Sequence, residues 1–162
     1  IQTIYISDCG VASNGNEEKD LGITSAAQIS ILLSVLKKGG CCIFKMFLPN
    51  SSELIVRCID VVNNSFNRVV IYKPPSSRPL NSEIYIVCIG LTNMNSYQHI
   101  ETIINNYEEN KLNIESINNL NSYPSYVKII NKLINKQINN FEKWKDERTP
   151  WSGMAGPKRD KR

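Results

Sequence analysis

The sequence lacks several features that assign a protein to a function class at once. Its five cysteines are an odd number and show neither the spacing of a disulfide framework nor a Cys-x-x-Cys pair suited to zinc. We therefore expect free thiols in a reducing compartment, and no metal site. No apolar run reaches the roughly 18 residues that a membrane span needs, and no signal peptide is recognisable. The one histidine, His99, has no partner in view.

Strong charge of one sign is also missing. A net charge of +4 over 162 residues permits an acidic partner such as nucleic acid but does not require one. Part of that excess lies at the C-terminus, where residues 148–162 are expected to form a flexible basic tail. The length fits one domain, or one domain with an appendage.

What the sequence does contain is a series of apolar runs in an alternating order. Strands are predicted at 1–7, 41–48, 66–72 and 84–89, and helices at 23–36 and 53–64. The segment from Asp8 to Asp20 is glycine- and asparagine-rich and predicts a loop. This order is the pattern of an α/β sheet. We expect strand 1–7 to pair in parallel with 41–48.

The connection over residues 73–83 is too short for the helical crossover that a parallel strand pair requires. The last two strands are therefore predicted to form an antiparallel hairpin at one edge of a mostly parallel sheet. Beyond residue 92 the composition shifts to Asn, Ile, Lys and Glu. Apolar residues with helical spacing there predict two amphipathic helices, the second starting after Pro124 and Ser125. We divide the chain into an α/β part, residues 1–92, and a helical extension, residues 93–147, before the tail.

Three polar residues stand where a ligand would bind such a sheet. Asp8 follows the first strand, Lys45 lies near the end of the second, and Glu83 directly precedes the last, where the edge hairpin returns. Ligands of open α/β sheets bind at the carboxyl ends of the parallel strands. Taken singly, Asp8 could cap a helix and Lys45 could be an edge residue with a solvated ammonium. Together they predict one site, with side-chain ends within about 10 Å of one another, since apo catalytic contacts are often long.

Three motifs carry a resemblance to a known family: SDCG at residues 7–10, IFKMF at 43–47 and KPPSSRPLNSEIYIVCIGL at 73–91. In this order and spacing they resemble the FtsJ/RrmJ family of RNA ribose 2′-O-methyltransferases, over residues 1 to about 92. The form of the third motif is most similar to the cap-specific mRNA branch. The resemblance implies the C-terminal half of a Rossmann-like S-adenosylmethionine methyltransferase sheet, whose edge hairpin is typical of that fold, followed by C-terminal α-helices.

The family uses a lysine–aspartate–lysine–glutamate tetrad. The resemblance assigns Asp8 to its aspartate, Lys45 to its second lysine and Glu83 to its glutamate. The first lysine and the glycine-rich loop for S-adenosylmethionine are expected before residue 1, so that we expect a fragment that is inactive alone. Asp8 would also lie near the cationic end of the cofactor.

The chemistry asks for these residue types because a ribose 2′-hydroxyl is a poor nucleophile. Lys45 is the candidate base, provided that desolvation or a nearby cation lowers its pKa. Asp8 would orient it, and Glu83 would hold a lysine or the ribose. The loop offers further contacts to RNA: phosphate contacts from Lys73, Ser76, Ser77 and Arg78, and a ribose contact from Asn81. The alternative is a proline-stiffened turn with solvated charges.

The leading hypothesis is methyl transfer to the first transcribed nucleotide of capped mRNA. A ribosomal or transfer RNA 2′-O-methyltransferase is the alternative within the class, and a catalytically inactive RNA-binding module is the alternative outside it. The expected location is intracellular, in the nucleus, or in the cytoplasm if the protein is viral. No membrane partner is expected.

Overall fold

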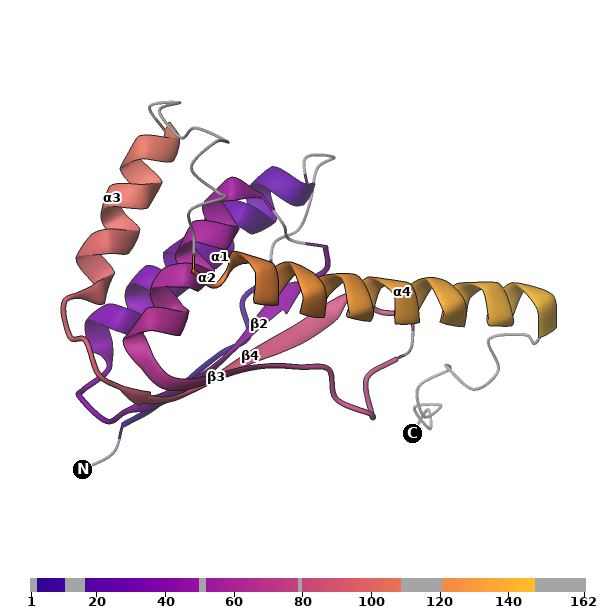
Figure 1. Ribbon diagram of the computed structural model, residues 1–162, viewed down its shortest axis with the longest axis horizontal. Coiled ribbons are helices and arrows are strands. Elements are labelled where there is room, and N and C mark those ends of the chain that lie inside the picture. The colour runs from indigo at the N-terminus through magenta and orange to yellow at the C-terminus, as the bar shows by residue number, and fades with distance from the viewer. Residues whose placement is uncertain (1–2, 11–16, 50–51, 79, 109–120, 148–162) are drawn as a thin grey trace, which may run out of the picture.

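The computed structural model describes residues 3–10, 17–49, 52–78, 80–108 and 121–147. The tail expected at 148–162 lies outside the described residues, as do parts of the loop after Asp8. The elements follow one another in the order strand, helix, strand, helix, strand, strand, helix, helix (Figure 1). They are β1 (Ile4–Ser7), α1 (Glu17–Val35), β2 (Cys41–Phe47), α2 (Glu53–Ser65), β3 (Phe66–Tyr72), β4 (Glu83–Leu91), α3 (Ser96–Glu108) and α4 (Tyr123–Glu147).

The four described strands form one sheet in the order β1-β2-β4-β3. β1 pairs in parallel with β2, while β4 pairs antiparallel with both β2 and β3. Both predicted pairings and the mixed α/β class are thus confirmed. The hairpin lies at one edge, as predicted, but its second strand is inserted between β2 and β3, so that β3 is the edge strand. Connection length alone does not specify that insertion.

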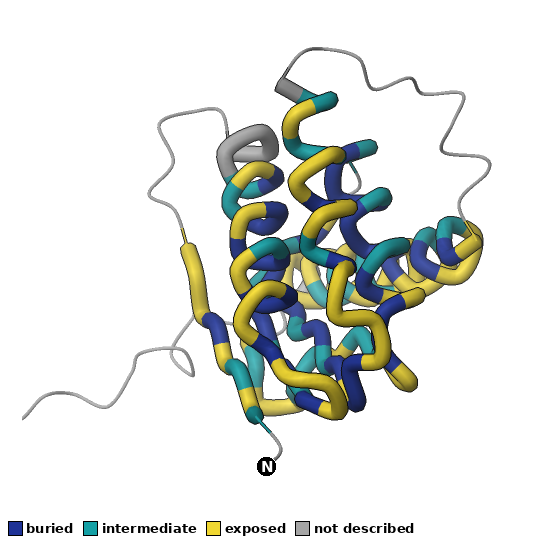
Figure 2. Tube along the Cα trace, turned by 90° about the vertical axis from the view of Figure 1, so that its left-hand side faces the viewer, coloured by how far each residue is buried: buried dark blue, intermediate teal, exposed yellow. Residues whose placement is uncertain are grey.

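The core lies between one face of this sheet and the helices. Alternate residues of β2 and β4 are buried on that face, with Phe44 opposite Ile86 and Met46 opposite Ile84. On the helical side, α1 and α2 contribute residues such as Leu33 that are buried at helical spacing. Figure 2 shows this as dark blue on the inner sides of the helices and yellow on their outer sides. The other face of the sheet is less covered, since Ile6 keeps 72% of its surface exposed.

The helix boundaries differ from the prediction at two places: α4 begins at Tyr123, before Pro124 rather than after Ser125, and the larger difference is at α1. α1 begins at Glu17, inside the segment that was predicted to be a loop. The glycines and asparagines of residues 10–16 made that predicted loop too long at its C-terminal end. A helix favours acidic residue types in its first turn because the N-terminal end carries partial positive charge, and the sequence supplies Glu17 and Glu18 there.

The two described helices of the C-terminal part, α3 and α4, pack against the rest of the molecule in different ways. α3 packs against α1 and α2, and its Ile100 is fully buried in the core. α4 is anchored through Tyr126 and Ile130, near α2 and β3. Its later turns are largely exposed, and in Figure 1 they run on beyond the sheet. His99 is exposed on α3.

Candidate active site

The carboxyl end of the parallel strand pair carries an ion pair. Asp8 follows β1 directly, and its Oδ1 lies 2.5 Å from the Nζ of Lys45 on β2. The Lys45 side chain is only 11% exposed, whereas that of Asp8 is 73% exposed. A largely covered lysine side chain is therefore paired with a carboxylate that still faces the solvent.

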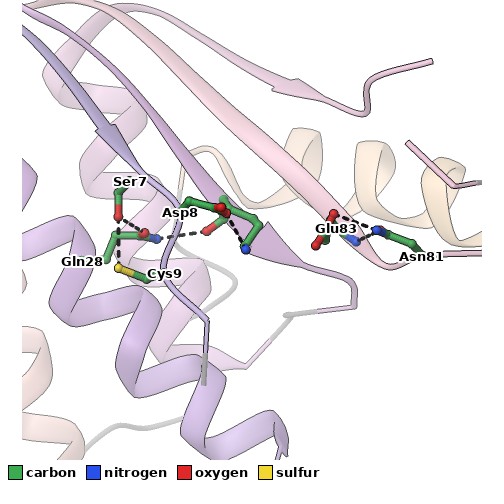
Figure 3. Close-up of polar contacts among 7 residues, drawn as sticks. Ser7, Asp8, Cys9, Gln28, Asn81 and Glu83 are labelled. Carbon is green, nitrogen blue, oxygen red and sulfur yellow. Dashed lines mark hydrogen bonds and ion pairs between the residues drawn. The ribbon is translucent and has the colours of Figure 1, made fainter. Parts of the chain in front are cut away.

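A buried glutamine fixes the backbone behind this pair. Gln28 of α1 accepts a hydrogen bond from the Ser7 hydroxyl (2.5 Å), and its amide donates to the Lys45 carbonyl (3.0 Å). Figure 3 shows Ser7, Cys9 and Gln28 gathered beside Asp8. One side chain thus joins the end of β1 to the middle of the second strand. The role of Gln28 was not predicted from the sequence, although a glutamine within the apolar run of α1 was a signal of a buried polar contact.

The surroundings of Lys45 favour its charged form. The hydrogen bond to Asp8 raises the pKa of Lys45, and burial opposes that rise only in part. The negative charges of Asp8 and Glu83 act in the same direction. In addition, the ammonium lies 5.4 Å from the centre of the Phe47 ring, at a distance where aromatic faces attract cations. In this state Lys45 is an ammonium ion, which is the opposite of what a free base requires.

Glu83 lies on the same face of the sheet as Lys45. Residues directly opposite in an antiparallel pair point to one side, and Glu83 is opposite Phe47 while Lys45 is opposite Tyr85. The Glu83 carboxylate accepts a hydrogen bond from the Asn81 side chain (2.7 Å), and the Glu83 amide donates to that side chain (2.6 Å), as Figure 3 shows. Asn81 therefore orients the carboxylate. The structure brings the three predicted catalytic residues to one edge.

Lys73 occupies the inside of the loop between β3 and β4. Its Nζ donates to the backbone carbonyls of Asn81 (2.6 Å) and Glu83 (2.9 Å), with the Ser77 hydroxyl 3.4 Å away. Burial lowers the pKa of Lys73, the negative charge of Glu83 opposes this in part, and the positive charge of Lys136 adds to the lowering. The ammonium links the outgoing and returning arms of the loop, a contact that sequence reasoning, which took Lys73 for a phosphate ligand, did not foresee.

The rest of the loop lines an open polar pocket of about 470 Å³. Arg78 and Ser76 are exposed there, whereas Ser77 is half-buried. Tyr85, which the sequence analysis did not single out, adds an aromatic ring beside Glu83. The pocket is lined by Pro74, Ser76, Ser77, Arg78, Asn81, Glu83 and Tyr85. It combines a guanidinium, hydroxyl groups and an aromatic face, which suits a nucleotide with its phosphate.

Two further observations concern the described part of the chain. No helix there is both long and apolar enough to span a membrane. Nor do three or more His, Cys, Asp or Glu side chains come together among those residues in an arrangement that could hold a metal ion.

Comparison with known proteins is consistent with this geometry. A family model described as FtsJ-like methyltransferase matches residues 3–91. An uncharacterized protein of Acanthamoeba polyphaga mimivirus is 30% identical over 144 residues, which are 84% of this chain and 18% of that protein. The cap-specific mRNA (nucleoside-2′-O-)-methyltransferase of Autographa californica nuclear polyhedrosis virus is 32% identical over 140 residues, or 84% of this chain and 47% of the viral protein.

A mammalian relative matches over a shorter stretch. The cap-specific mRNA (nucleoside-2′-O-)-methyltransferase 1 of Mus musculus is 43% identical over 67 residues, which are 40% of this chain and 8% of that protein. The chain thus spans less than half the length of the curated relatives named here.

Proposed function

Because this chain belongs to the FtsJ-like methyltransferase family, we propose that it is the substrate-side part of an enzyme that methylates the ribose 2′-hydroxyl of RNA. The methyl donor is S-adenosylmethionine, and the target is the first transcribed nucleotide of capped mRNA. The observation that carries the proposal is the placement of Asp8, Lys45 and Glu83 on one sheet edge beside the Arg78 pocket. The site of action would be the nucleus, or the cytoplasm for a viral protein.

The residues present fit the cationic end of the cofactor. The Asp8 carboxylate is exposed at the carboxyl end of β1, where it can bind a positive group while it still contacts Lys45. S-adenosylmethionine, when bound, supplies an electrophilic methyl group. The protein's own contribution is to align the ribose oxygen for attack and to remove its proton.

Lys45 is the proposed acceptor of that proton. An amine can take it only after it has lost its own, and the Asp8 contact, which raises the pKa of Lys45, opposes this loss. The ammonium form has another use, since it can donate a hydrogen bond to the 2′-oxygen and stabilise the negative charge that develops there. Base catalysis by Lys45 therefore requires that substrate binding weaken the Asp8 contact.

The other site residues have positioning and binding roles in this proposal. Glu83, oriented by Asn81, would accept a hydrogen bond from the ribose. Arg78 and the hydroxyl groups of Ser76 and Ser77 would bind the adjoining phosphate, because charge-assisted bonds to phosphate are strong. Lys73 would act indirectly, by holding the loop in its shape.

The test uses the protein made from the complete reading frame that contains this chain. Transfer of a tritiated methyl group from S-adenosylmethionine is measured with matched short RNAs that carry or lack a cap. We expect methylation of capped RNA only, with the label on the ribose of the first nucleotide. Equal methylation of uncapped RNA would favour a ribosomal or transfer RNA enzyme. RNA binding without any methylation would favour a binding module.

A further inference from the structure

The first half of α4 carries a regular row of lysines. Lys128, Lys132 and Lys136 are spaced four residues apart, so they follow one face of the helix with a rise of about 6 Å per step. All three are exposed. The helix sequence contains no acidic residue before Glu142. Like charges at this spacing repel one another, and no carboxylate of these turns offsets them. The row is therefore suited to an anionic ligand.

This lysine row starts at the loop of the candidate active site. The Gln137 amide donates a hydrogen bond to the Leu80 carbonyl over 2.9 Å, which ties α4 to the loop. A pocket of about 260 Å³ lies between the two segments. It is lined by Lys73, Pro74, Pro75, Ser77, Leu133, Lys136, Gln137 and Asn140. Lys136 is near enough for its charge to lower the pKa of Lys73. The ammonium of Lys136 thus stands beside the loop that also presents Arg78.

The next lysine along the row borders the neighbouring surface. Lys132 lines a second pocket, which α4 forms with α2 and β3. Positive side chains therefore continue from the loop along α4 in the direction of its N-terminus, away from the exposed last turns. Each lysine carries its ammonium group at the end of a long, solvated side chain, which suits contacts to successive phosphates along a flexible strand.

We propose that Lys136, Lys132 and Lys128 form a phosphate track for single-stranded RNA, which binds the nucleotides that follow the one in the Glu83 pocket. The inference rests on the proposed function, because it takes the occupant of that pocket to be RNA. It adds a second binding region that reads no sequence and extends the length of RNA that the protein holds. α4 is then part of the RNA-binding surface.

An acidic protein segment is the competing occupant, and the surface favours RNA. Exposed lysines contribute little at the centre of protein–protein interfaces, where they are depleted in favour of aromatic residues and arginine. Phosphate backbones, in contrast, are bound by rows of exposed cations, and such binding depends steeply on salt. The direct connection to the loop of the candidate active site also favours the ligand of that site.

The experiment compares two charge-matched double variants of the complete protein. In K132Q/K136Q the row is interrupted, whereas in K37Q/K38Q two exposed lysines next to the N-terminal end of β2 are removed, at the other end of the sheet. Affinity for capped RNAs of 4 and 20 nucleotides is measured over a range of salt concentrations, and circular dichroism checks that α4 stays helical.

For the 20-nucleotide RNA, we expect K132Q/K136Q to make the slope of log affinity against log salt shallower by about 1.4, because each phosphate contact to a single strand contributes about 0.7. Adding K128Q should make it shallower by about another 0.7. The slope for the 4-nucleotide RNA should change less, because so short a strand has few phosphates beyond the Glu83 pocket to contact the row. The K37Q/K38Q variant should match the wild type with both RNAs.

Equal slopes for K132Q/K136Q and K37Q/K38Q with the long RNA would overturn the track. A K132Q/K136Q variant that loses affinity for polyglutamate but not for RNA would overturn it in favour of an acidic protein partner. Failure of the proposed function is distinguishable, because these measurements need no methyl transfer. If no RNA is methylated and the long-RNA effect persists, the track stands and the proposed function fails.

Discussion

Lys45 and Glu83 lie on neighbouring, hydrogen-bonded strands. The two ends of the site, the Asp8–Lys45 pair and Glu83, are nevertheless held in place by different contacts. Lys45 lies on β2 and Asp8 directly follows β1, and Gln28 of α1 hydrogen-bonds to Ser7 and to the Lys45 carbonyl. Glu83 takes its orientation from Asn81 in the loop, and that loop takes its shape from the ammonium of Lys73. The sheet fixes the first end, whereas a set of side-chain contacts fixes the second.

Under the proposed function, this difference corresponds to a division of roles between the chemical step and RNA recognition. Residues on packed strands keep their positions closely, which a proton transfer needs. Loops tolerate change better and carry much of the specificity in many proteins. Substitutions at the Asp8–Lys45 end should therefore act on the chemical step, and substitutions in the loop should act on RNA binding and on the shape of the pocket.

The sharpest test of this division is Lys45→Ala in the complete protein. We expect methyl transfer to fall by at least about 100-fold, since a positioned acid or base contributes about 10²–10⁴-fold. Cofactor affinity, measured by calorimetry, should change little. Lys38→Ala, an exposed lysine outside the site, is the control. Near-normal turnover of Lys45→Ala would remove it as the base.

The Asp8→Asn variant tests the same end of the site through the pKa of Lys45. Asp8 raises the pKa of Lys45, so its loss should lower that pKa, which the ¹³Cε chemical shift of labelled lysine reports. If Lys45 is the base, the acid limb of the kcat/KM profile moves to lower pH. The pH dependence of the free energy of unfolding should agree in sign. The Asp8–Lys45 pair stabilises the fold fully below the usual lysine pKa, about 10.4, and this stabilisation is lost as the pH rises through the raised pKa of Lys45. An unchanged Lys45 titration would contradict the pairing.

Lys73→Met examines the loop end. The substitution leaves the carbonyls of Asn81 and Glu83 without their donor, at a cost of about 1–3 kcal/mol if they stay buried. We expect a lower melting temperature and a roughly tenfold lower kcat/KM, about 1.4 kcal/mol. Lys73→Arg should not restore either, because a planar guanidinium does not replace a compact ammonium inside the loop. Full rescue by arginine would indicate a phosphate contact instead.

Arg78→Ala should have a smaller effect, confined to binding. Arg78 is exposed at the pocket, so its loss should raise KM several-fold and reduce the salt slope by about 0.7, as for one phosphate contact to single-stranded RNA. The value of kcat should stay within about twofold of the wild type. A large fall in kcat with KM unchanged would place Arg78 at the chemical step and break the division.

Gln28→Leu should have the smallest effect on turnover. The leucine fills most of the space but leaves the Ser7 hydroxyl and the Lys45 carbonyl without this partner, so we expect a loss of stability of about 1–3 kcal/mol in thermal or urea unfolding. Gln28→Glu keeps the acceptor for Ser7 and should be the milder variant when protonated at low pH. Equal stability of wild type and Gln28→Leu would show that α1 does not fix this end.

The sequence predicted the strands, their directions and the approach of Asp8 to Lys45 at the strand ends, because apolar runs and strand ends are local patterns. The catalytic roles of Asp8, Lys45 and Glu83 stay a prediction. It missed the insertion of β4 between β2 and β3, which depends on packing across the whole sheet. It also missed the inward direction of Lys73 and the contacts of Gln28, since a side chain's partner is set by distant segments. The raised pKa of Lys45 could not be predicted for the same reason, because its main cause, Asp8, is 37 positions away in the chain.

The insertion of β4 between β2 and β3 has a consequence for folding during synthesis on the ribosome. Among the described strands, β3 pairs with β4 alone, and β4 is synthesised after it. Until residues 83–91 have emerged, the nascent chain holds β3 without a ladder partner and β2 with one side unpaired. Glu83 is the first residue of the strand that closes this gap. Glu83, the last of the three catalytic candidates, and the last of the described strands therefore arrive together, so that a chain ending before residue 83 lacks both.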